Sequence, residues 1–120
     1  MYISTLVAIC ELLRLLRKAK NLKSIELVEM GCNLSVGQIQ RLEGNLRAIR
    51  RRRRYHEYDA SQWEFRTQSE DNIRTYMMFL LKEDLPDKES FWIEDLLEVC
   101  KKWGVPTKHV LEEVGLADKE

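Results

Sequence analysis

Side chains suited to recognising a nucleic acid are concentrated in residues 35–54. Gln38 and Gln40 carry amides that can pair with adenine edges, and Arg41 carries a guanidinium that can pair with guanine. Five consecutive arginines follow at positions 50–54. The planar guanidinium group suits bidentate contacts to phosphate and insertion into a narrow minor groove. We therefore expect the first group, Gln38, Gln40 and Arg41, to contact bases. The second group, the arginines at 50–54, is expected to contact the phosphate backbone of the nucleic acid.

A helix over residues 36–43 is needed to present the first group. Ser35 precedes it as an N-cap, and Ile39 and Leu42, three residues apart, predict its buried side. The first turn of such a helix can then reach base edges in the major groove. The residues expected to contact DNA are Ser35, Val36, Gly37, Gln38, Gln40, Arg41, Arg47, Arg50, Arg51, Arg52, Arg53 and Arg54.

A second helix is predicted just before this one, over residues 25–32, with Ser24 as its N-cap. Asn33 tolerates a left-handed backbone and is expected to end that helix. Leu34 then serves as a buried plug between the helices. The pattern as a whole predicts a helix-turn-helix unit over residues 24–45.

Apolar residues at helical spacing predict further helices over residues 4–20, 71–83 and 89–103 and a short one beginning at 105–107, with a basic helix through the arginine run. We therefore expect an all-α fold of five to seven helices in a single domain. Its parts are a helix-turn-helix core (1–45), an inserted segment with the arginine run (46–84) and closing helices (85–120). The predicted core includes Leu6, Leu13, Leu34, Ile39, Leu42, Leu97, Val110 and Leu111.

Charge divides the chain into two opposite halves, although Lys and Arg number 20 and Asp and Glu also number 20. Residues 1–54 carry 12 basic against four acidic side chains, net +8, and residues 55–120 carry eight against 16, net −8. Such asymmetry is typical of a polyanion-binding face, with the acidic half available to a protein partner. The alternative is that the charges only solvate opposite helices.

Other chemistry finds little support in the sequence. Cys10, Cys32 and Cys100 form neither a CxxC pair nor a disulfide framework, which favours the cytoplasm, and no metal or cofactor site is expected. Glu11 and Arg14 interrupt the first apolar run, so no membrane span is predicted. Without a Gly-rich phosphate loop or a Ser/His/Asp arrangement, we expect no enzyme.

The segment 24–45 resembles the XRE family, the Cro and phage-repressor type of helix-turn-helix regulators. The turn Cys32-Asn33-Leu34-Ser35 is similar to the family's Leu-Gly-Val-Ser, and residues 39–43, Ile-Gln-Arg-Leu-Glu, are similar to its Ile-Ser-Arg-Ile-Glu. Residues 97–111 resemble the way that family closes, and the two stretches cover about half of the chain. The resemblance implies a sequence-specific regulator of transcription that binds double-stranded DNA, of the repressor kind.

Regulators of this type commonly bind paired half-sites as symmetric dimers, so a homodimer is expected. Candidate interfaces are a second apolar seam on the first helix (Val7, Leu12 and Leu15) and the C-terminal aromatic residues (Phe79, Phe91, Trp92 and Trp103), and we favour the C-terminal half. For the seam on the first helix, we prefer burial within the chain to a dimer contact.

Two other functions remain open. In one, the helix-turn-helix is a scaffold, and the acidic half, with Trp92 and Trp103, binds another protein. In the other, the arginine run is an RNA-binding arm, with Tyr55, Tyr58 and Trp63 as stacking surfaces.

Overall fold

All regular structure in the described part of the chain is helical. A computed structural model describes the backbone of residues 3–54 and 70–115 and the side chains of residues 4–51 and 70–115. No strand occurs in these ranges. The all-α fold of five to seven helices predicted from apolar spacing is therefore confirmed. The helices are α1 (Ile3–Ala19), α2 (Ser24–Glu29), α3 (Val36–Glu43), α4 (Asn45–Arg54), α5 (Glu70–Leu81), α6 (Ile93–Lys102) and α7 (Lys108–Glu113).

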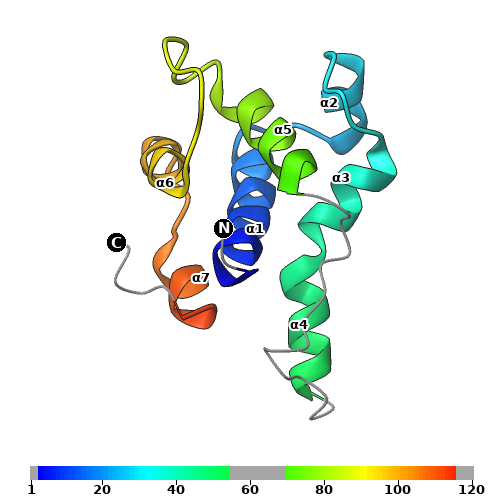
Figure 1. Ribbon diagram of the computed structural model, residues 1–120, viewed down its shortest axis with the longest axis vertical. Helices are drawn as coiled ribbons and strands as arrows, with labels where there is room; N and C mark the ends of the chain where they lie inside the picture. Colours follow the sequence, from blue (N-terminus) through cyan, green and yellow to red (C-terminus); the bar gives the residue numbers. More distant parts are fainter. Residues whose placement is uncertain (1–2, 55–69, 116–120) are drawn as a thin grey trace.

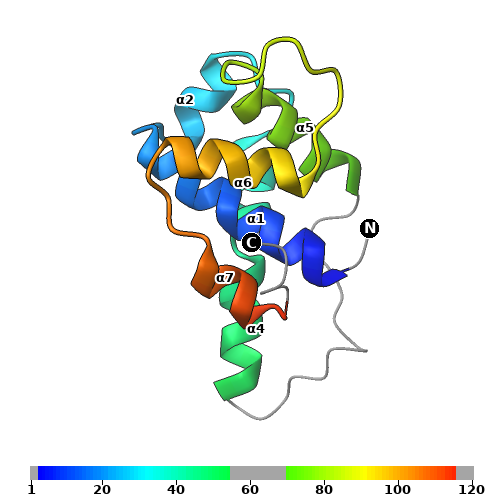
Figure 2. The same cartoon turned by 90° about the vertical axis from the view of Figure 1, so that its left-hand side faces the viewer.

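Helix α1 is the central element, and it contacts α3, α4, α5, α6 and α7. In Figure 1, α3 and α4 lie on one side of α1 and α6 and α7 on the other, and Figure 2 shows α6 crossing α1. Val7 and Leu12 are buried and Leu15 is half-buried against the same core. The second seam of α1 is thus covered within the chain, as preferred, because helices pack on both sides of it.

Seven of the eight predicted core residues are buried, and one prediction is wrong. Leu97 is only half-buried, because it lies on a side of α6 that borders a groove and no helix covers it. The core also takes Ile73, Tyr76 and Met77 from α5. The segment 46–84 therefore supplies part of the core through α5 and is more than a surface insertion.

Residues in the left-handed region follow four of the helices. Asn21 (φ 59°) follows α1, and the Leu22 N–H donates to the Arg17 carbonyl at 3.1 Å. Gly31 (φ 102°) follows α2, and the Cys32 N–H donates back in the same way. Gly104 (φ 72°) follows α6, and Gly115 (φ 84°) follows α7.

The prediction that Asn33 ends the first helix of the unit is therefore wrong. Helix α2 stops at Glu29, and Gly31 takes the left-handed position because glycine has no Cβ to strain there. The N-cap was also misplaced, since Ser24 is the first residue of the helix and Lys23 precedes it. Six residues, 30–35, consequently separate α2 from α3.

No helix in the described ranges is both long enough and apolar enough to span a lipid bilayer.

Candidate nucleic-acid interface

Reciprocal hydrogen bonds fix the start of α3. The Gln38 N–H donates to Ser35 Oγ at 3.1 Å, and the Ser35 N–H donates to Gln38 Oε1 at 2.8 Å. Ser35 is thus the predicted N-cap, and the pair forms a capping box. Gln38 Oε1 is therefore already engaged, which leaves mainly the NH2 group of this side chain for another molecule.

The outer side of α3 presents three of the predicted contact residues to solvent, Gly37, Gln40 and Arg41. Ile39 and Leu42 face the core, as predicted, and α3 packs against α1, α2 and α4. The side chains of Gln40 and Arg41 form no hydrogen bond or ion pair with another described side chain. Val36 and Gln38 are half-buried, so they are less accessible than predicted.

A buried ionic cluster holds the end of α3 in place. Arg17 on α1 donates to both carboxylate oxygens of Glu43, at 2.7 and 2.9 Å, and to the Leu22 carbonyl at 2.6 Å. The Tyr76 hydroxyl on α5 donates to the same carboxylate. Burial, together with the negative charge of Glu43, raises the pKa of Tyr76, so the phenol stays protonated as a donor. The cluster joins α1, α3 and α5 but occupies Arg17 fully.

The arginines of α4 divide into groups with different surroundings. Arg47 and Arg51 are exposed one turn apart, on the same side of the helix, and neither pairs with a described carboxylate. Arg50 is instead held by Glu113 of α7 through two bonds of 2.8 Å. The predicted helix through the arginine run is confirmed, because α4 reaches Arg54. The side chains of Arg52, Arg53 and Arg54, and the aromatic residues Tyr55, Tyr58 and Trp63, lie outside the described part.

Sequence reasoning missed the basic residues that α1 contributes to this region. A polar hollow of about 350 Å³ lies between the second half of α1, the start of α2 and the corner where α3 meets α4. Lys18 of α1, Gln40 of α3 and Arg47 of α4 all line it. The signal in the sequence is the cluster of cations at the end of the first helix, Arg17, Lys18 and Lys20.

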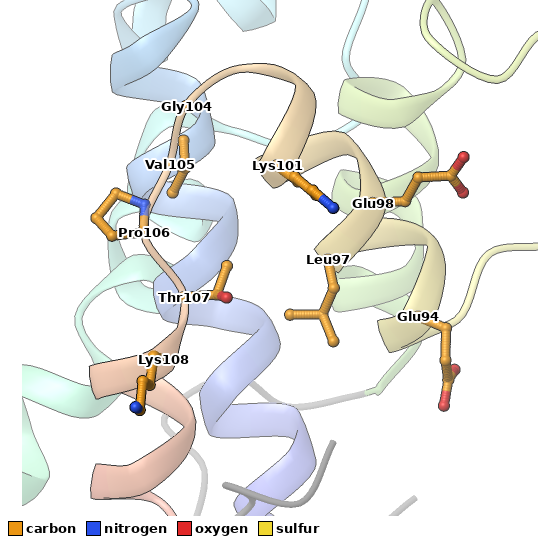
Figure 3. A pocket seen from close by; sticks show the side chains of 9 residues that line it. All are labelled: Glu94, Leu97, Glu98, Lys101, Gly104, Val105, Pro106, Thr107 and Lys108. Carbon is orange, nitrogen blue, oxygen red and sulfur yellow. The ribbon is translucent and has the colours of Figure 1, made fainter. Parts of the chain in front are cut away.

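Two further hollows lie away from this region, each of about 700 Å³. One runs between α6 and residues 104–108 (Figure 3), where Leu97 of α6 lies opposite Thr107. The other lies beside α5, between Met78 and the residues that follow α2. Both are more apolar than the hollow near Lys18 and Arg47.

The aromatic residues considered for a dimer interface have unequal exposure. Phe91 is buried in the core and Phe79 is half-buried, so the prediction that Phe91 lies at an interface is wrong. Trp92 and Trp103 are 51% and 41% exposed. Each already has a partner, since Arg74 lies over the Trp92 ring and Trp103 Nε1 donates to Asp84 at 3.0 Å.

The thiols and carboxylates do not assemble a reactive centre in the part of the chain that is described. Cys10, Cys32 and Cys100 are free and buried, and burial raises the pKa of Cys10 and of Cys100 to about 12, so both stay protonated thiols. No group of three or more His, Cys, Asp or Glu side chains within those residues is placed to hold a metal ion.

Taken together, these features define an all-helical protein in which α2 and α3, joined by residues 30–35, pack together near exposed basic side chains of α1 and α4. Comparison with known proteins found no matching family model, no similar curated protein and no similar solved structure.

Proposed function

We propose that this chain is a sequence-specific regulator of transcription, a repressor that binds double-stranded DNA with α3 in the major groove. The observation that carries the proposal is the exposed side of α3, which presents Gly37, Gln40 and Arg41 beside the basic side chains Lys18 and Arg47. A helix with a capped start and exposed amide and guanidinium groups suits readout of base edges. The partly buried cations Arg17 and Lys20 take no part, because they pair within the fold.

The division of labour between the helices follows from their chemistry. Gln40 and Arg41 of α3 carry the readout of sequence, whereas Lys18, Arg47 and Arg51 hold the phosphate backbone. The excess of acidic side chains in residues 55–120 opposes binding of DNA by charge alone, which favours binding through readout of sequence. Three free, buried cysteines support a cytoplasmic location, where thiols stay reduced.

Selection of bound sequences from a random duplex pool tests this proposal. The expected result is an enriched motif, with binding to the enriched duplex at least a hundredfold tighter than to random duplex at the same salt concentration. The variant Gln40→Ala should lower that ratio, whereas Lys82→Gln, which removes an exposed cation on the opposite half, should not. Absence of binding to any duplex at low salt would overturn the proposal in favour of a protein-interaction module, and binding to single-stranded RNA alone would favour the RNA-binding alternative.

We further propose that the regulator is a homodimer through the groove between α6 and residues 104–108 (Figure 3). Leu97 lies near its middle, Glu98 and Lys101 belong to α6, and Lys108 lies on the other wall at the start of α7. In a dimer with a two-fold axis, Glu98 of one copy can pair with Lys101 or Lys108 of the other. The two Leu97 side chains then lie between these ion pairs. This interface leaves α3 free in both copies.

Sedimentation of the full chain with charge-reversed variants tests this assembly. We expect a dimer at micromolar concentration, a monomer for Glu98→Lys or Lys101→Glu alone, and recovery of the dimer in the double variant because the pair is reversed as a whole. A wild-type chain that sediments as a monomer with and without duplex would defeat the assembly and leave DNA binding to be judged by the selection experiment.

A further inference from the structure

The polar hollow near α1 is rich in basic side chains. Two of its basic side chains come from different helices and are exposed, Lys18 of α1 and Arg47 of α4. Ser24 and Gln40 add a hydroxyl and an amide. We call this region the basic hollow; its remaining lining residues are Arg14, Arg17, Glu43 and Gly44.

The carboxylate in the lining does not neutralise those two cations. Glu43 is already bound by both Arg17 and Tyr76, and Arg17 and Glu43 together form a neutral pair in the floor. Arg14 directs its Nε to Glu11. Lys18 and Arg47 have no carboxylate partner among the described residues. The basic hollow therefore keeps two positive charges beside neutral hydrogen-bonding groups.

We propose that the basic hollow binds a phosphate group. Arg47 offers a planar fork for two phosphate oxygens, and Lys18 offers a compact positive charge. The Ser24 hydroxyl can donate a hydrogen bond to a remaining oxygen. The positive charges of Lys18 and Arg47 would repel a cation from the basic hollow. The Arg17–Glu43 ion pair, which also lines the hollow, links α1 to α3 beside the exposed cations.

The phosphate has two sources, a DNA backbone or a small phosphate-bearing molecule. The first rests on the proposed function, because Gln40 lies both in the basic hollow and on the exposed side of α3. A phosphate seated there flanks the helix that reads the bases and fixes its depth in the groove. A small molecule seated there would instead compete with DNA for the same cations.

Lys18→Gln and Arg47→Gln test the first source, with Lys82→Gln as the matched control for loss of one exposed charge. Binding to random duplex is followed by fluorescence anisotropy as salt is raised. Each hollow variant should weaken binding and reduce the slope of log affinity against log salt by about 0.9, the value for one phosphate contact on duplex DNA. Lys82→Gln should keep the wild-type slope. Urea unfolding of each variant checks that the fold is retained. We expect no loss of stability, because the side chains of Lys18 and Arg47 are both exposed.

Pyrophosphate tests the second source, with amide chemical shifts recorded on the full chain at constant ionic strength and chloride as the reference anion. Shifts confined to residues of the hollow, and lost in Lys18→Gln and Arg47→Gln, support a small-molecule phosphate site even if no duplex binds. Reduced slopes without pyrophosphate shifts support a DNA phosphate. Unchanged slopes together with no shifts overturn the basic hollow as a phosphate site, and the proposed function then survives if the wild-type chain still binds duplex.

Discussion

Gln38 shows how one side chain can serve the fold and limit recognition. Its Oε1 accepts the Ser35 N–H at 2.8 Å, so bidentate pairing with adenine, which needs that oxygen as an acceptor, would break the capping box. Gln40, with its amide exposed and not bonded to a described side chain, has no such conflict. The main base-reading amide is therefore expected at Gln40.

The two glutamines should consequently respond differently to substitution. Gln38→Ala should lower the free energy of unfolding by about 1 kcal/mol, because it removes the acceptor for the Ser35 N–H. Gln38→Glu keeps an acceptor and should retain stability. Gln40→Ala should leave stability unchanged and lower affinity for the selected duplex by about 1 to 3 kcal/mol. Urea unfolding and anisotropy measure both effects, and loss of stability in Gln40→Ala would contradict this assignment.

Glu43 is the residue whose loss should harm the fold most in this region. Glu43→Gln leaves Arg17, whose side chain is 12% exposed, without its ion pair, and should lower the free energy of unfolding by about 3 kcal/mol. Tyr76→Phe removes one donor but keeps the pair, so a loss of about 1 kcal/mol is expected. Urea denaturation compares the two variants, and a larger loss in Tyr76→Phe would be inconsistent with a cluster centred on the ion pair.

At the scale of the element, the start of α3 separates stability from binding. A Cβ at Gly37 meets only Ser35 Oγ, at 3.9 Å, so side chains fit there without strain. Gly37→Glu should slightly stabilise the helix, since the residue lies in its positive first turn, but should weaken duplex binding at least tenfold by repelling phosphate. Ser90→Glu adds the same charge on the other half of the chain and should change binding little. Equal effects of the two variants would show that net charge alone controls affinity.

Sequence reasoning located the helices well because apolar spacing is a local property. Helix α3 was predicted at its observed bounds from Ser35, Ile39 and Leu42, and α4 was predicted from the helix propensity of arginine. The end of α2 was misplaced because Asn33 and Gly31 both tolerate the left-handed region, and the choice between them depends on the last turn of the helix.

The site was predicted less completely, because pairing between distant residues cannot be read from spacing. Arg50 was expected at a phosphate, yet it binds Glu113, 63 positions further along the chain. Arg17 and Glu43 were not recognised as a pair, since only the packing of α1 against α3 brings them together. The contribution of Lys18 to the basic hollow follows from the same packing.

At the scale of the whole molecule, Asp84 links the ends of three helices. Its carboxylate accepts from Lys20 at 2.6 Å, Lys102 at 3.1 Å and Trp103 at 3.0 Å, and its side chain is 5% exposed. Burial alone would raise the pKa of Asp84, but these hydrogen bonds outweigh it and hold the pKa below its ordinary value of 3.8. The folded state therefore gains stability from ionised Asp84.

The sign of that shift predicts a dependence on pH. A carboxyl group whose pKa is lower in the folded state stabilises the fold above its unfolded pKa, and the effect disappears as pH falls through the folded value. The difference in unfolding free energy between the wild type and Asp84→Asn should therefore be constant from pH 7 to 5 and shrink below about pH 4. Urea unfolding at each pH measures it. A difference that stays constant down to pH 2.5 would contradict an ionised Asp84 in the cluster.

The central position of α1 also has a consequence for the order of synthesis. Translation produces α1 before any of the helices that cover it, and α6 and α7, which pack on one side of it, come last (Figure 1). At about 5 to 20 residues per second, its apolar surface waits several seconds for these partners. A nascent chain halted after α4 should therefore expose Val7, Leu12 and their neighbours to ribosome-bound chaperones, and the fold can close only once the acidic half has emerged.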